Sequence, residues 1–355
     1  MQNKNFPYKE LCGTIHLHTK YSDGGVDYPT LVNAAHAVGL DYIIVTDHMS
    51  LGGLADGYEG IRDNVIVLIG YEHQDPGNLN HYLAIGVSEV YNSLTNPQDY
   101  VSAVRKAGGI GFIAHPAEKR NYIGRFPPYP WTDWNVKDYD GLEIWNQMSE
   151  WVEQLKSWRS VFRIFYPRRF LESAPAELLH RWDNLNRSQF ISGIGGVDAH
   201  TRKIGVGLFS FVVFPIKVEL KGIRTHVYLP DTIETTNFSS VKPALLKALK
   251  NGNSFISNFR RGDASGSKIG ILCESGDVYT PGMNLCSSQQ KSFIVELPEK
   301  AEIRLLFNSV VVNRMYGKKA YFNIDKGIGV YRIEAYKNGK AWIYSNPFPV
   351  GQYPL

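Results

Sequence analysis

Residues 15–25 read IHLHTKYSDGG and combine two histidines with an aspartate on a glycine turn. His16 and His18 come at the end of an apolar run typical of a buried strand, and Asp23 follows shortly after. In a strand, residues i and i+2 point to the same face, so the two imidazoles are expected to aim at one point. The pair alone also fits two buried histidines with ordinary hydrogen bonds. Whether they are metal ligands depends on whether the rest of the sequence supplies further ligand-type side chains.

Matching side chains stand at the ends of several other apolar runs. They are Asp47 and His48 in IIVTDH, Glu72 in VLIGYE, His81 in NHYLAIG, His115 in GFIAHP, and Asp198 and His200 in GIGGVDAH. In a β/α barrel the carboxyl ends of the strands converge on one rim, where active sites are built. Imidazole and carboxylate groups without thiolates are ligands for zinc, manganese or iron(II). The sequence therefore predicts a metal site at such a rim.

The order of the predicted elements favours an α/β fold with two domains. Up to about residue 225, short apolar runs alternate with helical segments such as PTLVNAAHAVGL, which implies parallel strands buried on both faces. We predict a closed or nearly closed barrel over residues 1–225. Over residues 226–355 one helix, KPALLKALKNG, precedes a series of short strands, and Asn338-Gly339 is a hairpin signal. This second part is predicted to be a small antiparallel β-sandwich.

The composition is that of an ordinary globular protein. Hydrophobic residues make up 43% and charged residues 20% of the 355 residues, and the formal net charge of +4 is scattered along the chain. This pattern tolerates an anionic substrate but gives weak support to nucleic-acid binding, which needs a concentrated basic face. Three cysteines without a CxxC pair fit a reducing compartment. With no signal-peptide pattern or membrane-length apolar run, we expect a cytoplasmic protein.

The motifs HxH, SDG, TDH, a strand-end glutamate, AHP and DAH occur in an order that resembles the PHP (polymerase and histidinol phosphatase) superfamily of metallohydrolases. This resemblance runs from His16 to His200 and implies a distorted seven-stranded β/α barrel with a trinuclear metal cluster. The C-terminal third, through VYRIEAY and AWIYSNPFPV, resembles the β-domain of a PHP branch related to carbamate-ester metallohydrolases.

The resemblance also implies how the metals share their ligands. The first metal takes His16, His18, Glu72 and Asp198, the second takes Glu72, His81 and His115, and the third takes Asp23, His48 and His200. Glu72 bridges the first two metals, and we assign Glu72, Asp198 and His200 as the catalytic residues among these ligands. Asp23 stands where some branches have a histidine, and this oxygen donor could weaken the preference for zinc or lower the occupancy of the third site.

The expected reaction is hydrolysis. Two metals about 3.5–4 Å apart lower the pKa of a bridging water towards about 7 and clamp the oxygens of the displaced group. We expect a metal-dependent phosphoesterase with two or three zinc, manganese or iron ions, acting on a small phosphate ester or nucleotide. Hydrolysis of a carboxylic or carbamate ester or amide is an alternative, as is a non-catalytic metal-binding module. The sequence leaves the substrate and the oligomeric state open.

Cations follow two of the predicted ligands. Lys119 and Arg120 come after His115, and Arg202 and Lys203 come after His200. Such side chains can bind a phosphate or carboxylate, although solvated loop charges are the simpler interpretation.

Two carboxylates complete the set of candidates. Glu143 ends the GLEIW strand on the substrate side or behind a ligand, and Asp47 either orients a ligand or caps a strand.

Overall fold

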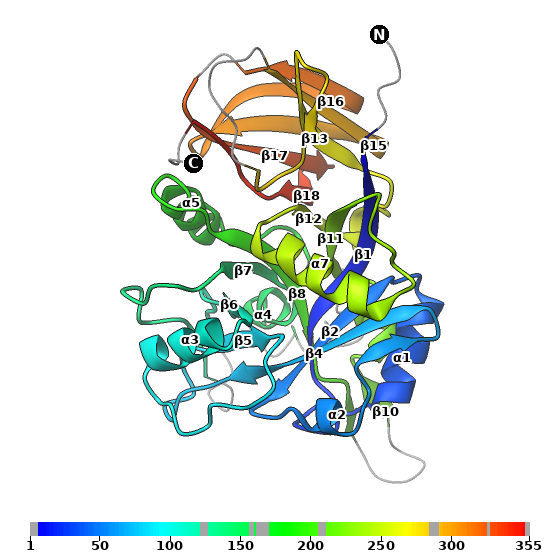
Figure 1. Cartoon of the computed structure of the whole chain (residues 1–355), viewed down its shortest axis with the longest axis vertical. Coiled ribbons are helices and arrows are strands. Elements are labelled where there is room, and N and C mark those ends of the chain that lie inside the picture. The colour runs from blue at the N-terminus through cyan, green and yellow to red at the C-terminus, as the bar shows by residue number, and fades with distance from the viewer. Residues whose placement is uncertain are drawn as a thin grey trace.

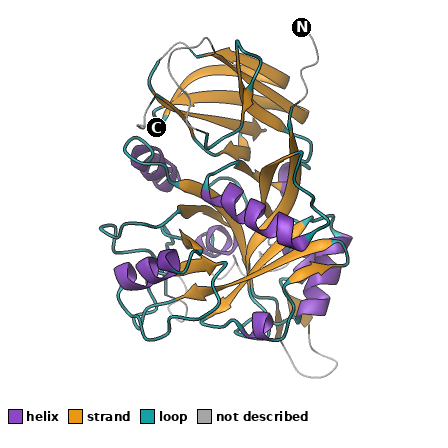
Figure 2. Cartoon of the chain, viewed as in Figure 1, coloured by secondary structure: helices purple, strands orange, loops and turns teal. Residues whose placement is uncertain are grey.

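The chain folds into a barrel and a β-sandwich that lie end to end (Figure 1). The computed structural model describes residues 6–120, 127–155, 160, 170–204, 211–283, 291–324 and 327–351. Helices surround the barrel, whereas the sandwich consists of strands and loops (Figure 2). This arrangement agrees with the fold class predicted from the sequence.

Seven strands close the barrel, in which each strand pairs with the next and the last pairs with the first. They are β1 (Tyr8–Leu17), β2 (Tyr42–His48), β4 (Val65–His73), β5 (Tyr82–Ile85), β6 (Ile110–Ile113), β7 (Gly141–Asn146) and β8 (Ser192–Ala199). Strand β5 runs antiparallel to both neighbours, and the other pairings are parallel. The barrel is therefore distorted, as predicted. The short β3 (Gly60–Arg62) pairs with β4 outside this ring.

Alternate residues of the barrel strands bury opposite faces. Ile44 and Leu68 belong to an inner apolar cluster, whereas Ile43 and Val67 pack outward in a cluster that contains Leu31. Leu31 lies on α1 (Tyr28–Ala37), a helix whose first turn is capped by the Asp27 side chain. Both strand faces are thus covered, which explains why the apolar runs of the sequence are nearly continuous.

The remaining helices lie outside or at the ends of the barrel. They are α2 (Gly52–Ala55), α3 (Pro97–Lys106), α4 (Gln147–Glu153), α5 (Ala176–Leu185), α6 (Ile216–Glu219) and α7 (Phe238–Lys250). Leu245 and Leu249 of α7 join the inner barrel cluster, so this helix closes the end of the barrel that faces the sandwich (Figure 1). Among the described residues, no helix has the length and apolar character needed to span a membrane.

The strands outside the barrel are mostly antiparallel partners in the C-terminal part of the chain. They are β11 (Ile223–Pro230), β12 (Ser254–Asn258), β13 (Lys268–Cys273), β14 (Val278–Tyr279), β15 (Lys291–Phe307), β16 (Val310–Asn323), β17 (Gly329–Lys337), β18 (Lys340–Ser345) and β19 (Phe348–Val350). A short 3₁₀-helix, η4 (Phe259–Arg261), follows β12. The predicted hairpin is confirmed, because Asn338 and Gly339 have positive φ angles of 51° and 75° and join β17 to β18. Separately, β9 (Arg202–Ile204) and β10 (Phe211–Val213) form a two-stranded sheet beside the barrel.

Backbone pairing continues from the barrel into the sandwich. Strand β1 pairs with β11, β11 with β12, and β12 with β18, so β1 belongs to both parts. Its first residue, Tyr8, packs against the apolar core of the sandwich, and its last residue, Leu17, lies in the outer cluster of the barrel. The two parts are therefore joined by hydrogen bonds as well as by the chain.

A buried ion cluster also joins them. Arg332 of β17 donates from Nε and Nη2 to the two oxygens of Asp183 on α5, at 2.9 and 3.0 Å. Its Nη1 donates to Glu334 at 2.6 Å, and all three side chains are at most 6% exposed. Removing Arg332 would leave the buried carboxylates of Asp183 and Glu334 without this cation.

We expect Arg332→Ala to lower the free energy of unfolding by about 3–5 kcal/mol, the range typical of breaking a buried pair. Urea unfolding followed by circular dichroism measures this loss. Lys319→Ala is the control, because Lys319 pairs with Glu296 on the surface, and the urea midpoint should barely move. Equal midpoints for both variants would show that the buried cluster adds nothing to stability.

Candidate metal centre

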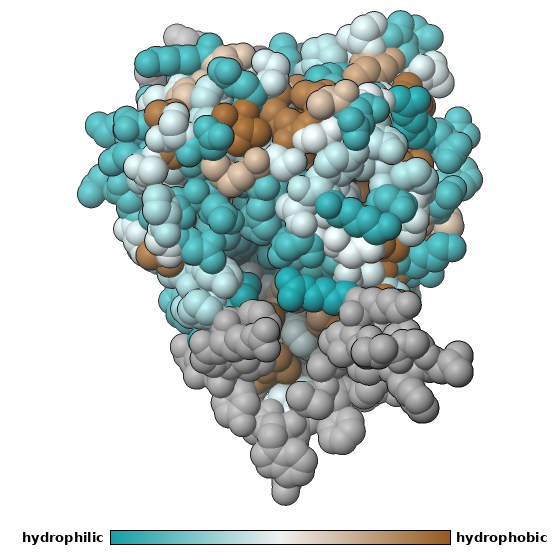
Figure 3. Space-filling model, turned by 90° about the horizontal axis from the view of Figure 1, so that it is seen from below, coloured by the Kyte–Doolittle hydropathy of each residue, from teal (hydrophilic) through white to brown (hydrophobic). Residues whose placement is uncertain are grey.

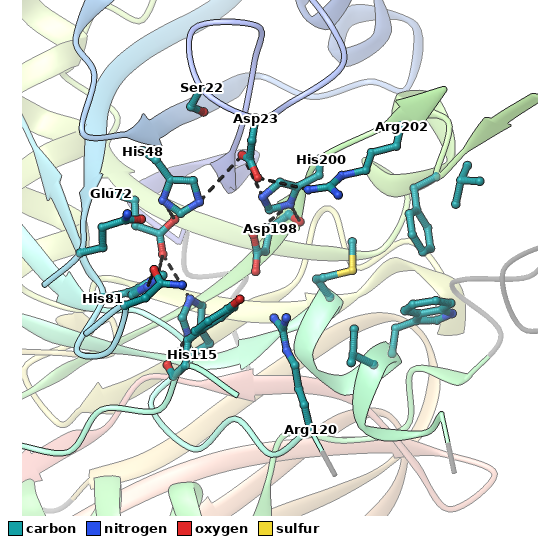
Figure 4. A pocket seen from close by; sticks show the side chains of 18 of the residues that line it. Ser22, Asp23, His48, Glu72, His81, His115, Arg120, Asp198, His200 and Arg202 are labelled. Atoms are coloured by element: carbon teal, nitrogen blue, oxygen red, sulfur yellow. Dashed lines mark hydrogen bonds and ion pairs between the residues drawn. The ribbon is translucent and has the colours of Figure 1, made fainter. Parts of the chain in front are cut away.

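The carboxylate of Glu72 is the centre of the site (Figure 4). Glu72 lies on β4 and is only 1% exposed. Imidazole nitrogens of five histidines surround its two oxygens. They are His81 Nδ1 at 2.7 Å and His115 Nε2 at 3.2 Å from Oε1, and His16 Nε2 at 3.0 Å, His18 Nε2 at 3.3 Å and His48 Nδ1 at 3.3 Å from Oε2. These histidines come from four parts of the barrel rim, at the ends of β1, β2 and β6 and just before β5.

Asp198 provides a second carboxylate beside Glu72. Its Oδ1 lies 3.3 Å from His18 Nε2, 3.4 Å from His200 Nδ1 and 3.6 Å from His16 Nε2. Asp198 lies on β8, which pairs with β1, the strand that carries His16. The closure of the barrel between its first and last strands therefore brings this carboxylate to the histidines.

The strands are irregular where they carry these side chains. His16 and Asp198 have positive φ angles of 66° and 55°, and the pairing of β1 with both neighbours shifts register between Ile15 and Leu17. The sequence predicted that His16 and His18 converge through regular strand alternation. They do converge, with ring centroids 5.2 Å apart, but through a bulge that turns His16. Left-handed backbone at non-glycine residues is uncommon and often marks functional sites.

The turn after His18 brings Asp23 to the outer edge of the cluster. Asp23 Oδ1 lies 3.2 Å from His200 Nε2 and 3.8 Å from His48 Nε2. Gly24 is required here, because an added Cβ would lie 2.2 Å from the carbonyl oxygen of His18. This close packing explains the glycines of the SDGG sequence.

Asp47 holds this turn and does not reach the cluster. Its carboxylate accepts hydrogen bonds from the Thr19 backbone and hydroxyl at 2.7 Å each and from the Ser22 hydroxyl at 2.6 Å. The segment between His18 and Asp23 is thereby fixed. The sequence left two roles open for Asp47, orienting a ligand or capping a strand. Asp47 instead bonds to Thr19 and Ser22 and so supports the turn that carries the ligand candidates.

The donors fit divalent metal ions. Four overlapping groups, each of three or four His, Asp or Glu side chains, place their ligand atoms within 4.8 Å of one another. Both ring nitrogens of His18 and Nδ1 of His48 are buried without a well-formed hydrogen bond, as expected for ligand atoms. Burial lowers the pKa of His48 to about 4, so its imidazole is neutral and can bind a cation. Burial opposes ionisation of Glu72, but the histidines, His16 first, hold its pKa well below the usual range.

The division of ligands among three metals stays a prediction. One group joins His18, Asp23, His48 and His200, which includes the three ligands expected at the third metal. The other groups are His16, His18 and Glu72; His16, His115 and Asp198; and His48, Glu72 and His81. They mix residues expected at different metals, because all nine side chains share one crowded rim.

Glu143 lies behind the ligands. It is fully buried on β7, where Oε1 lies 3.0 Å from His16 Nδ1 and Oε2 accepts from the His115 backbone at 2.8 Å. It does not line the main cavity, so this position fits a support for the ligands rather than contact with substrate. The sequence had left both roles open.

Sequence reasoning missed other supporting residues. The amide of Asn146 donates to Glu143 at 2.9 Å and to Asp198 at 3.3 Å. The ring of Tyr129 stacks on His81 with centroids 5.4 Å apart, and its backbone carbonyl lies 3.2 Å from His115 Nδ1. Asn146 ends the GLEIWN strand, and this position could have indicated it. Tyr129 follows in a long loop where no pattern marks it.

The predicted cations occupy different positions. Arg120 and Arg202 line the main cavity and approach the cluster from two sides (Figure 4). Arg120 pairs with Glu118 at 2.5 Å, and Arg202 lies 3.3 Å from Asp23. Lys119 points elsewhere: it is exposed, pairs with Glu177 and does not line the cavity. The side chain of Lys203 lies outside the described residues.

A cavity of about 730 Å³ opens beside the cluster. This volume suits a small organic molecule. Metal-site residues and the two arginines line one part, and apolar side chains line another. Figure 3 shows this end of the molecule, where hydrophobic residues are visible inside a hollow of a largely hydrophilic surface.

Comparison with known families agrees with this geometry. Residues 14–111 match the model of the PHP domain. This part of the chain is similar to a PHP domain. The match includes the ligand candidates from His16 to His81 and ends before His115, so the structure itself adds His115, Asp198 and His200 to the same rim. No curated protein sequence matches the chain.

Solved structures resemble the chain at low sequence identity. A two-domain protein containing a predicted PHP-like metal-dependent phosphoesterase, from Bacteroides vulgatus, has a TM-score of 0.49 and 15% identity, with 98% of this chain and 100% of that chain covered. PsfC from Pseudomonas syringae has a TM-score of 0.42 and 12% identity, with coverage of 69% and 90%. An amidohydrolase from Chromobacterium violaceum, with bound sulfate and no metal, has a TM-score of 0.36 and 16% identity, with coverage of 57% and 92%.

We expect at least two divalent ions per chain, because the clustered donors exceed what one ion accepts. Elemental analysis after reconstitution with zinc, manganese or iron measures the ratio. Glu72→Ala should reduce the ratio most, since Glu72 contacts histidines through both oxygens, whereas Asp23→Ala should remove only the outer ion. The exposed Glu89→Ala is the control. A ratio of one or below in the unaltered protein would exclude a multinuclear site.

Proposed function

We propose that this protein is a metal-dependent phosphoesterase that hydrolyses a small phosphate ester. The observation that carries the proposal is the position of Arg120 in the metal-site cavity. Its side chain is 11% exposed, and its Nε is buried without a hydrogen-bond partner. A buried guanidinium with an unsatisfied donor is well suited to a phosphate or similar oxyanion.

Arg120 is held in place for this task. Glu118 is only 3% exposed and accepts from Arg120 at 2.5 Å, from the Tyr129 backbone at 2.8 Å and from Ser149 at 2.8 Å. The guanidinium also lies over the Tyr129 ring, 4.9 Å from its centroid. A side chain fixed in this way loses little further entropy when it binds an anion.

Divalent ions at the cluster would supply Lewis-acid activation of water and of the phosphoryl oxygens. The residues of the chain would divide the remaining work. The histidines and the carboxylates Glu72 and Asp198 would hold the ions, and Glu143 fixes the orientation of His16. Arg120 and Arg202 would orient the phosphoryl group and balance the charge that its oxygens carry in the transition state.

Hydrolysis of a carboxylic or carbamate ester or amide is the second candidate. The apolar part of the cavity favours it, because a neutral ester would be accommodated there. The two arginines favour the phosphate ester, since a neutral ester would offer no oxyanion to the unpaired Nε of Arg120. A purely metal-binding module has no need for either arginine in the cavity. A cytoplasmic location, the domain limits at residue 225 and a small anionic partner remain part of this proposal.

We expect Arg120→Ala to raise KM for a phosphate monoester by about 10–100-fold, because a hydrogen bond to a charged group contributes about 1.5–3 kcal/mol. Steady-state kinetics of the reconstituted protein measure this change. Lys119→Ala is a matched control, because the neighbouring Lys119 is paired outside the cavity, and its KM should not change. Faster turnover of neutral aryl or carbamate esters, with no effect of Arg120→Ala, would favour the second candidate instead.

A further inference from the structure

The apolar wall of the cavity is one face of helix α4 and the residues after it. Met148, Trp151, Val152 and Leu155 all line the cavity, and they follow the i, i+3, i+4, i+7 spacing of a single helical face. Val213 and Phe214, which lie at and after the end of β10, complete the wall. Side chains from two distant segments thus form one apolar surface.

The side chains of this wall also pack against one another. Met148, Trp151 and Leu155 form a separate buried cluster against which Val152 and Phe214 pack. The rings of Trp151 and Phe214 meet edge to face with centroids 4.6 Å apart. Phe214 has a positive φ of 55°, which is unusual for a bulky residue and requires support from its surroundings.

Helix α4 connects this wall to the metal ligands and to Arg120. Asn146 caps the helix by accepting from the Ser149 backbone at 2.8 Å, and its amide donates to Asp198 at 3.3 Å. The Ser149 hydroxyl donates to Glu118, which holds Arg120. The cation and the apolar face therefore have a fixed relation to each other, one beside the other in the same cavity.

We propose that this wall is a subsite for an apolar, preferably aromatic, group of the substrate, whose phosphate is held at the metal cluster and Arg120. The inference rests on the proposed function and adds the substrate class: phosphate esters of alcohols that carry an aryl or similar apolar group. A purely polar alcohol, such as a sugar or glycerol, would leave the wall in water and gain nothing from it. The cavity volume of about 730 Å³ accommodates both parts of such a molecule.

The test compares 3-phenylpropyl phosphate with n-propyl phosphate. Both release a primary alcohol, so their chemical reactivity is matched and the difference reports on the phenyl group. Calorimetry with the reconstituted protein measures the affinity for the corresponding phosphonates, 3-phenylpropylphosphonate and propylphosphonate, which have no ester bond to hydrolyse. A pocket that accepts the phenyl group should favour the larger member of each pair by about 10–100-fold.

Variants identify the wall as the cause of the preference. Phe214→Ala and Val152→Asn, on the two sides of the wall, should each reduce the preference for the phenyl compounds by about tenfold. Val212→Ala is the matched control, because Val212 is 49% exposed, lies two residues from Phe214 and does not line the cavity. It should leave the preference unchanged, and thermal unfolding and metal content verify that each variant is folded and loaded.

The outcomes separate the subsite from the reaction. Equal affinity for the two phosphonates, or a preference that both wall variants retain, would overturn the subsite. Hydrolysis of both phosphates at equal efficiency would also overturn it while leaving the phosphoesterase standing. A phosphonate preference lost in both wall variants, without hydrolysis of either phosphate, would support the subsite and refute the proposed reaction.

Discussion

The buried charge of Glu72 is the constraint on which the barrel rim depends. A carboxylate removed from water is costly unless cations or donors surround it, and here histidines do so on all sides. Those histidines come from strand ends that are distant in the sequence, so the charge is satisfied only when the barrel is closed. The same crowding creates buried nitrogens without hydrogen bonds, which metal ions would satisfy. Folding, ligand geometry and metal affinity are thus coupled through one side chain.

The sequence was informative where chemistry follows strand periodicity. The apolar runs predicted the barrel strands, because parallel strands covered on both faces require almost continuous hydrophobic sequence. The strand-end positions of the ligand candidates predicted that they would meet. The sequence could not show the bulge at His16 or the left-handed backbone of Asp198, since these arise from register shifts between β1 and its neighbours. Nor could it separate Lys119 from Arg120, adjacent residues whose directions depend on their partners Glu177 and Glu118.

The cavity combines two kinds of surface that sequence motifs treat separately. Metal-binding motifs mark the charged part, whereas the apolar part comes from a short helix and a distant strand without any recognisable motif. Helix α4 relates the two, because its capping residue Asn146 also contacts Asp198. In the proposed phosphoesterase the metal residues would set the reaction, and the apolar residues would determine which molecule enters.

The position of β1 has a consequence for synthesis on the ribosome. This strand emerges from the ribosome well before its barrel partner β8, which begins at Ser192, and its other partner β11, which begins at Ile223. A nascent chain that ends before these strands has an open sheet edge and an incomplete set of ligands. Long-range pairing of this kind is slow and leaves intermediates exposed to aggregation. The complete set of ligand candidates can therefore come together only after β8 has been synthesised and has paired with β1.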